Sequence, residues 1–320
     1  MRARGPLLAL AALVAAWPWL APRYFVFLAS LILVNSVVAI GLNLLSGYTN
    51  QLSFGHAGFL AIGAYTAALL TIHAPAVPVV VTLAAAGAVT AVVGLAFGVP
   101  CLRLSGLYLA MATLAFGFVI AELILSLDWL TRGADGLRVP SARLGGWPLA
   151  TDTARYYLVA AVTVVLVAAA VNLAGTRTGR ALLAIRESEI AAQASGVSVA
   201  RYKTIAFGVS AFYTGVAGGL FAFVVGFLSP DAFDVFLSVD FVVMIIVGGL
   251  GSVSGAALGG VFVAVSLELM RDLHEYRLVL YALLLIVIML VRPEGLLGSR
   301  ELPHVLADLY RRRRAREVTP

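Results

Sequence analysis

Charged residues are scarce in this chain of 320 residues, because Asp, Glu, Lys and Arg together make up only 12% of it. A soluble domain of ordinary composition carries about 25% charged residues, which cover its surface. Hydrophobic residues make up 62% of this sequence instead. The composition therefore excludes an ordinary soluble protein and predicts an integral membrane protein.

Lysine and cysteine are almost absent, since Lys203 and Cys101 are the only residues of their kinds. A single cysteine forms no intrachain disulfide and no cysteine cluster for a metal, so we interpret Cys101 as a packing residue. We predict no metal and no cofactor on this chain. The lysine also stands outside any Gly-x-x-x-x-Gly-Lys-Ser/Thr sequence, which excludes a phosphate-binding loop of that kind.

Charge is missing from long continuous stretches, the longest of which runs from Tyr24 to Leu102. A helix that crosses a bilayer needs about 20 predominantly apolar residues. Lipid permits only helices and closed barrels as spanning structures, and runs such as Val79–Ala86 lack the alternation of a barrel strand. The predicted fold is an all-α polytopic membrane protein with one transmembrane domain over residues 1–320.

The apolar runs predict about eight full spans and one broken region. The N-terminal run resembles a signal peptide, but the bulky Trp17-Pro-Trp19 leaves no small-residue cleavage site, so it is predicted to remain as a span. Region 240–270 contains Gly248-Gly-Leu-Gly-Ser252, which should break a helix. It predicts either a re-entrant hairpin or two tilted spans, giving eight to ten spans in all. The full spans are expected at 7–21, 24–45, 56–73, 77–99, 106–127, 155–174, 204–227 and 278–291.

The distribution of Lys and Arg predicts that both termini lie in the cytoplasm. With the N-terminus inside, the inner segments hold fifteen of the 22 basic residues and the outer segments hold seven. Cytoplasmic loops carry an excess of basic residues in membrane proteins. Residues 299–320 then form a basic cytoplasmic tail, in which Arg311–Arg314 could also contact anionic lipid. The positive charge therefore needs no nucleic-acid partner.

Two stretches rich in glycine and serine interrupt the apolar runs, at Ser46–Gly55 and at Gly248–Gly255. The first lies at the inner end of its span, and the second is approached from outside. Two broken helices of opposite sense predict an inverted repeat, which many transporters contain. Small residues that let helices pack closely explain the same pattern equally well.

The loop 175–203 is the most informative cytoplasmic segment. Arg180–Ser195 favours a helix, and Gly196 is placed to end it. Such a helix suits docking on a cytoplasmic partner, and a solvated connector fits its spacing equally well. On one face of the helix we expect Leu182, Ile185, Glu189 and Ala192.

Within this loop, the segment Glu189–Gly196 resembles the EAA loop of ABC-importer permeases, with Ile190 inserted after the Glu. Further segments resemble the M-type (LivM-like) subunits of the branched-chain amino acid ABC permease family. The resemblance covers roughly residues 24–298. One departure is Arg132, where the family usually has glycine. The matching segments are Gly41–Phe59, Leu104–Thr113, Gly179–Glu189, Gly248–Ser252 and Arg292–Gly298.

The resemblance implies a transmembrane subunit of an ATP-driven importer that moves branched-chain or related amino acids by alternating access. It implies a multi-pass protein of the bacterial cytoplasmic (inner) membrane and not an enzyme. The implied partners are a second related permease subunit, two cytoplasmic ATPases that hold ATP and Mg, a periplasmic binding protein and membrane lipid. The implied ATPase-coupling residues are Arg180, Arg186, Glu187, Glu189, Ala192 and Gly196. The implied outer-loop contacts to the binding protein are Arg132, Asp135, Gly136, Asp231 and Asp234.

Polar residues inside the apolar runs form a further set of candidates. Buried amides and hydroxyls need hydrogen-bond partners, so these residues either line a translocation path or hold the helix breaks together. We favour capping or packing over proton transfer for the histidine of this set. The candidates are Asn43, Asn50, Gln51, Ser53, His56, Gly248, Gly249, Gly251 and Ser252.

Four alternative functions remain beside this one. The first is a structural or scaffold membrane protein, against which the broken helices argue. A urea or short-chain amide permease fits the same architecture. An ion-coupled secondary transporter needs paired intramembrane acids, for which Glu122 and Glu268 are the candidates. Glu122 is otherwise an interfacial carboxylate near Asp128. An intramembrane enzyme lacks support, since neither His-Glu-x-x-His nor Gly-x-Ser-x-Gly occurs.

Overall fold

The computed structural model describes residues 16–144, 147–270, 276–292 and 295–297. Most of the predicted span 7–21 and the whole tail 299–320 lie outside these residues. Helices follow one another along the chain, with four short strands in the connections. In order, the elements are α2 (Arg23–Leu42), η1 (Asn43–Gly47), α3 (His56–His73), α4 (Val79–Cys101), α5 (Leu107–Ser126), α6 (Asp128–Thr131), η2 (Gly133–Asp135), β1 (Leu137–Arg138), β2 (Arg143–Leu144), β3 (Trp147–Pro148), α7 (Asp152–Gly175), α8 (Arg177–Glu187), α9 (Glu189–Ala194), α10 (Val199–Val225), β4 (Phe227–Leu228), η3 (Pro230–Phe233), α11 (Val235–Gly248), α12 (Val253–Leu269) and α13 (Arg277–Val291).

Six of the described helices are long and apolar enough to cross a membrane, which confirms a polytopic helical protein. This number is smaller than the predicted count of about eight full spans. The predicted span 7–21 falls mostly outside the described residues, and α13 has only 15 residues. The six are Arg23–Gly47, α3, α4, α5, α7 and α10.

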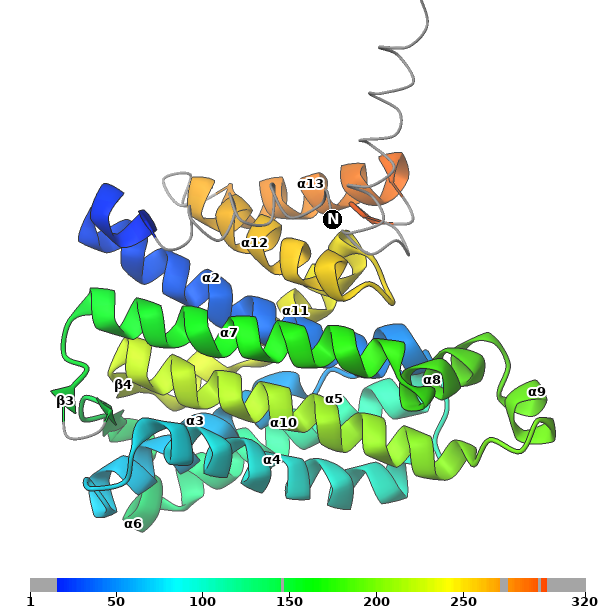
Figure 1. Cartoon of the computed structure of the whole chain (residues 1–320), viewed down its shortest axis with the longest axis horizontal. Helices are drawn as coiled ribbons and strands as arrows, with labels where there is room; N and C mark the ends of the chain where they lie inside the picture. Colours follow the sequence, from blue (N-terminus) through cyan, green and yellow to red (C-terminus); the bar gives the residue numbers. More distant parts are fainter. Residues whose placement is uncertain (1–15, 145–146, 271–275, 293–294, 298–320) are drawn as a thin grey trace, which may run out of the picture.

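Helix α10 is the centre of the bundle, where it packs against α2, α3 and α4 (Figure 1). In its most apolar 18-residue stretch, 78% of the residues are buried. The approach to α3 is very close, because a Cβ atom at Gly63 would overlap the backbone of Gly215. Small residues let helix backbones meet in this way, and helices in lipid associate largely through such packing.

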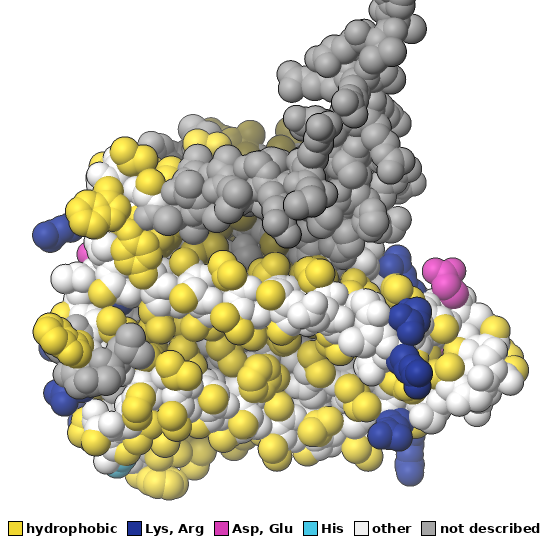
Figure 2. All heavy atoms as spheres, in the orientation of Figure 1, with side chains coloured by type: hydrophobic (Ala, Val, Ile, Leu, Met, Phe, Trp, Pro, Cys, Tyr) yellow, Lys and Arg dark blue, Asp and Glu magenta, His cyan; other side chains and the backbone are white. Residues whose placement is uncertain are grey.

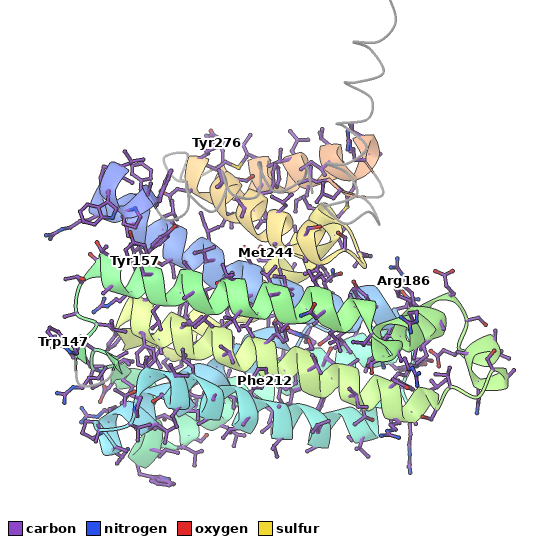
Figure 3. All side chains as sticks on the ribbon, in the orientation of Figure 1. Trp147, Tyr157, Arg186, Phe212, Met244 and Tyr276 are labelled. Atoms are coloured by element: carbon purple, nitrogen blue, oxygen red, sulfur yellow. The ribbon has the colours of Figure 1, made fainter. Side chains whose placement is uncertain are left out.

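Charged side chains gather at two opposite ends of the molecule, and hydrophobic side chains cover the region between them (Figure 2). One end carries Arg186 of α8, and the other carries Trp147 of β3 (Figure 3). We call the end that carries Arg186 the α8 end. The end that carries Trp147, where α6 also lies, is the α6 end. Trp19, Trp129 and Trp147 are each about 80% exposed. Exposed tryptophans of this kind are enriched at the membrane–water interface.

The predicted break in region 240–270 is confirmed, because α11 ends at Gly248 and α12 begins at Val253. The Ser252 side chain caps α12 by accepting a hydrogen bond from the Gly255 N–H at 3.0 Å. The turn between the helices reaches the α8 end, where Arg186 Nη1 donates to the Leu250 carbonyl at 3.4 Å. Helices of 14 and 17 residues are roughly 21 and 26 Å long, which is shorter than the roughly 30 Å hydrocarbon core of a bilayer. Neither helix is among the six candidate spans, so the lengths do not decide between a re-entrant hairpin and two tilted spans.

The two interruptions meet at the same end of the bundle. Asn43, at the start of the first, hydrogen-bonds to Gly251 and Ser252 of the second. Helices α2 and α11 therefore both run toward the α8 end, where each of them reaches its interruption. The prediction that the two broken helices run in opposite directions is wrong, and this pair of breaks provides no evidence for an inverted repeat.

Candidate functional site

The predicted coupling segment forms two helices and not one. Helix α8 ends at Glu187, and α9 begins at Glu189. Ser188 is extended between them, and its hydroxyl accepts a hydrogen bond from the Ala191 N–H at 3.3 Å. Serine is a favoured N-cap residue because it satisfies an otherwise unpaired helical N–H. The prediction of one helix over Arg180–Ser195 is therefore wrong at this cap.

The face predicted to hold Leu182, Ile185, Glu189 and Ala192 is observed only in part. Leu182, Ile185 and Ala192 are buried, whereas Glu189 is exposed. Helix α9 projects from the bundle at the α8 end, beyond the ends of the long helices (Figure 1). Its most exposed apolar side chain is Ile190, at 83%. An isoleucine exposed on a projecting helix is available to a partner. The sequence reasoning treated it only as a departure from a motif.

Glu189 lies away from the apolar face and ties α9 to α10. Its Oε1 lies 2.6 Å from Lys203 Nζ, and the lysine side chain is only 8% exposed. The glutamate side chain is 53% exposed, so water screens the pair from one side. The chain's only lysine therefore anchors the projecting helix to the central span.

Gly196 ends α9 in the way that the sequence predicts. Its φ angle is +83°, in the left-handed region that favours glycine. The Gly196 N–H donates to Gln193, and the Val197 N–H donates to Ala192, both at 3.0 Å. These two bonds form a Schellman motif, which satisfies the last carbonyls of the helix.

The remaining coupling candidates point in different directions. Arg186 turns inward to the Leu250 carbonyl, as described above. Arg180 is exposed, and its Nη1 donates to the Gly175 carbonyl at 2.9 Å. Glu187 is exposed at the end of α8. Arg180 and Glu187 are thus available to a partner, whereas Arg186 contacts the chain's own α11–α12 turn.

Asn43 joins that turn to the end of α2. Its Nδ2 donates to the Ser252 carbonyl at 2.7 Å, and its Oδ1 accepts from the Gly251 N–H at 3.0 Å. The residue is fully buried and begins η1, a π-helical segment. Such segments frequently mark functional sites in helices. A continuous set of hydrogen bonds therefore runs from α8 through the turn at Gly249–Ser252 to α2.

The segment after η1 is stabilised by a second group of buried hydrogen bonds. His56 begins α3 and is fully buried; its Nε2 lies 2.7 Å from Ser210 Oγ of α10, and its Nδ1 lies 3.2 Å from Ser53 Oγ. Gln51 Oε1 accepts from Thr49 Oγ1 at 3.0 Å. Gln51 Nε2 is buried and has no hydrogen-bond partner among the residues that the structure describes. These hydrogen bonds show that the break between η1 and α3 is stabilised largely by side chains of the break itself.

Asn50 differs from its neighbours because its side chain is exposed. Its φ angle is +57°, in the left-handed region that asparagine tolerates better than most residues. It turns the chain from η1 into the buried segment before α3.

The predicted outer-loop residues lie at the α6 end, far from the coupling segment. Asp128, Arg132 and Asp135 line one hollow of about 590 Å³ together with Leu125 and Ala134. Arg132 has a φ angle of +62°, where a glycine would cost nothing. This backbone explains why glycine is the expected residue at this position.

The other outer-loop candidates have structural roles at this end. A Cβ atom at Gly136 would overlap the Phe227 ring, beside the pairing of β1 with β4. Asp234 caps α11, since its Oδ1 accepts from the Leu237 N–H at 2.8 Å. Asp231 is exposed in η3.

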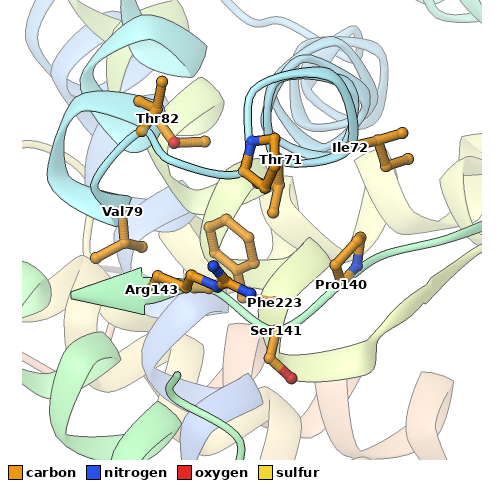
Figure 4. Close-up of a pocket in the computed structure, with 11 residues that line it drawn as sticks. Thr71, Ile72, Val79, Thr82, Pro140, Ser141, Arg143 and Phe223 are labelled. Carbon is orange, nitrogen blue, oxygen red and sulfur yellow. The ribbon is translucent and has the colours of Figure 1, made fainter. Parts of the chain in front are cut away.

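The sequence reasoning missed a smaller pocket at the α6 end (Figure 4). It measures about 240 Å³ and lies between the α3–α4 connection and the segment that leads into β2. Arg143 and the hydroxyl residues Thr71, Thr82 and Ser141 are among its lining residues. No sequence motif marks the pocket, because its walls come from three separate parts of the chain, residues 71–82, residues 140–143 and Phe223.

Comparison with known proteins connects these features to a family. A family described as "Branched-chain amino acid transport system / permease component" matches residues 24–290. The permease proteins LivM of Salmonella typhimurium and of Escherichia coli K12 are both 38% identical to this chain over 315 residues. In both cases the alignment covers 91% of this chain and 74% of the relative.

A more distant relative is the permease protein LivH of Escherichia coli K12. It is 24% identical over 288 residues, which cover 84% of this chain and 93% of LivH. All three relatives are named as components of a high-affinity branched-chain amino acid transport system. No solved structure matches the chain.

Proposed function

The chain belongs to the family of permease components of branched-chain amino acid transport systems, and on that premise we propose that it translocates branched-chain amino acids as one subunit of an ATP-driven importer. It does so in the bacterial inner membrane by alternating access. The α8 end faces the cytoplasm together with both termini, and the α6 end faces the periplasm. The excess of basic residues in the segments assigned to the inside supports this orientation.

Three kinds of protein partner follow from this proposal. A second, related permease subunit pairs with this chain, in agreement with its similarity to both LivM and LivH. Two ATPases bind at the α8 end and hold ATP and Mg. A periplasmic binding protein delivers substrate at the α6 end, where Arg132 and Asp135 line an open hollow.

The observation that carries the proposal is the projecting helix α9 and its connections. Ile190 is exposed for an ATPase to cover, while Glu189 ties the helix to α10. The preceding helix α8 is bonded to the α11–α12 turn through Arg186. Movement of a bound ATPase therefore reaches three helices of the bundle through direct contacts. Residues 175–203 act as the coupling loop of a single permease domain.

Reconstitution of the chain with the second permease, the ATPases and the binding protein tests the proposal. Gly196→Ala should leave the protein inserted but greatly reduce leucine uptake and ATPase retention, because α9 then ends with the wrong geometry. Gly226→Ala is the matched control. Gly226 also has a positive φ angle, +74°, and open space around it, but it lies at the opposite end of α10. Normal uptake with Gly196→Ala would refute the coupling role.

The same reconstitution separates the alternative functions. Uptake of urea or a short-chain amide without uptake of leucine would identify an amide permease. Uptake that persists without ATPases would identify an ion-coupled transporter. The second outcome has little structural support, since Glu268 accepts a hydrogen bond from the Tyr24 hydroxyl and Glu122 lies in a different helix, α5.

A further inference from the structure

The pocket of Figure 4, which we call the Arg143 pocket, contains hydrogen-bond donors that the chain itself leaves unused. Arg143 extends from β2 toward the centre of the pocket, beside Phe223. Among the residues that the structure describes, none forms a hydrogen bond or ion pair with its guanidinium. The hydroxyl of Ser141, which also lines the pocket, has no hydrogen-bond partner among the same residues.

The charge of the pocket is positive, because none of its described lining residues is an Asp or Glu. A guanidinium group binds a carboxylate through two parallel hydrogen bonds. A neighbouring hydroxyl can donate a further hydrogen bond to the same group. Arg143 and Ser141 together therefore suit the carboxylate of a ligand.

The wall formed by the end of α3 has the opposite character. Thr71 and Ile72 lie in the last turn of this helix and line the pocket. A continuing helix would pair the Thr71 carbonyl with the residue four positions later, but that residue is Pro75, which has no N–H. The Ile72 carbonyl also accepts no hydrogen bond from a described residue. Free carbonyls at the C-terminus of a helix carry partial negative charge and stabilise a cation.

The remaining walls are apolar and include Val77, Val79 and Phe223. Val79 and Phe223 are buried, so these walls are fixed in the fold. Apolar walls with a few polar groups are typical of small-molecule sites. The volume of about 240 Å³ corresponds to roughly eight water molecules. This space suits a small amino acid and is too small for a helix of another protein.

We propose that the Arg143 pocket binds one branched-chain amino acid at the α6 end. The carboxylate contacts Arg143 and Ser141, the ammonium group contacts the carbonyls at the end of α3, and the branched side chain packs on the apolar walls. An inorganic anion would satisfy Arg143 but would leave the carbonyls and the apolar walls without contacts. The inference rests on the proposed function, which brings amino acids to this end of the chain.

Equilibrium binding of labelled leucine to the full-length chain in detergent tests the site. Leucinamide lacks the carboxylate, and isocaproate lacks the ammonium group. Each should bind about tenfold more weakly than leucine, as expected for the loss of hydrogen bonds to a charged group. Acetate that displaces leucine at equal concentration would show a site for simple anions and would overturn the proposal. Absence of leucine binding would also overturn it.

Two arginine variants test the role of Arg143. Arg143→Gln should weaken leucine binding about tenfold and abolish the preference for leucine over leucinamide. Arg138→Gln is the matched control, because Arg138 is an exposed arginine of β1 that does not line the pocket. It should change neither quantity. A preference for leucine that survives in Arg143→Gln contradicts the assignment.

Protection from labelling tests the site without removing the arginine. In Ser141→Cys, a saturating concentration of leucine should slow the reaction of the introduced thiol with maleimide. Ser195→Cys, at the α8 end, should react at the same rate with and without leucine. An equal rate in Ser141→Cys under both conditions rejects the proposal even where Arg143→Gln does not fold.

The two levels of inference fail in different ways. If the unaltered transporter takes up no leucine, the proposed function fails, whatever the binding experiments show. If it takes up leucine while the purified chain shows no leucine binding that depends on Arg143, the proposed function stands and this inference fails.

Discussion

Lys203 Nζ lies 2.6 Å from Glu189 Oε1, across the gap between the projecting helix α9 and the central helix α10. The lysine is nearly buried, while the glutamate is half exposed. The pair is therefore accessible to solvent on one side, and its strength depends on salt. This contact holds α9 against α10.

Glu189→Gln should loosen α9 by about 1 kcal/mol, a discounted value because the glutamate is exposed. Hydrogen exchange of the α9 amides, followed by mass spectrometry, measures this loosening. Lys203→Met should produce a similar increase in exchange. The double variant should lose less than the sum of the two changes, and full additivity would show that the two side chains do not interact.

Asn43→Ala should destabilise the purified protein by about 2 to 3 kcal/mol, because it leaves a buried N–H and a buried carbonyl without partners. Thermal unfolding in detergent measures the loss. Asn50→Gly serves as the control, since Asn50 is exposed and its left-handed backbone also suits glycine. Equal unfolding temperatures for Asn43→Ala and the unaltered protein would contradict the role of Asn43 as a link between the interruptions.

Gly63→Ala should destabilise the bundle by about 1 to 3 kcal/mol, the cost of forcing an extra methyl group into a packed interface. The methyl group would overlap the backbone of Gly215, so α3 and α10 must separate. Gly117→Ala is the matched control on α5, because its new Cβ would meet only Phe54, at 3.8 Å. Thermal unfolding that is equally affected in both variants would refute the close approach.

Arg132→Gly should stabilise the loop at the α6 end by roughly 1 kcal/mol, since glycine adopts the left-handed conformation without the cost borne by other residues. The measurement is the unfolding temperature of the purified protein. Gly133→Ala should act in the opposite direction, because Gly133 has a φ angle of +49° and Asp128 lies against it. A lower unfolding temperature for Arg132→Gly would show that its side chain contributes more than its backbone costs.

The sequence was sufficient to place most of the helices. The charge-free runs predicted α3 at 56–73 and α13 at 278–291, and the structure has them at His56–His73 and Arg277–Val291. This agreement follows from the absence of water in a bilayer, which leaves an apolar run little choice but a helix. The helix end at Gly196 and the break after Gly248 were also predictable, because glycine at such positions typically ends or breaks a helix.

Contacts between distant segments were not predictable. Nothing in the sequence near Asn43 indicates a bond to Gly251, because pairing across some 200 positions depends on how the helices pack. The split at Ser188 was missed because good helix formers on both sides outweighed one capping residue. The pocket lined by Arg143 likewise comes from segments that meet only in the fold.

Cys101, the only cysteine of the chain, is buried at the end of α4. A maleimide reagent added from solution therefore meets almost no reactive thiol in the folded protein. A cysteine introduced at Ser141 or at Ser195 would be the single labelled site, and these positions lie at opposite ends of the bundle. The natural sequence thus provides a background on which the sidedness of each loop can be measured in intact cells without first removing a native thiol.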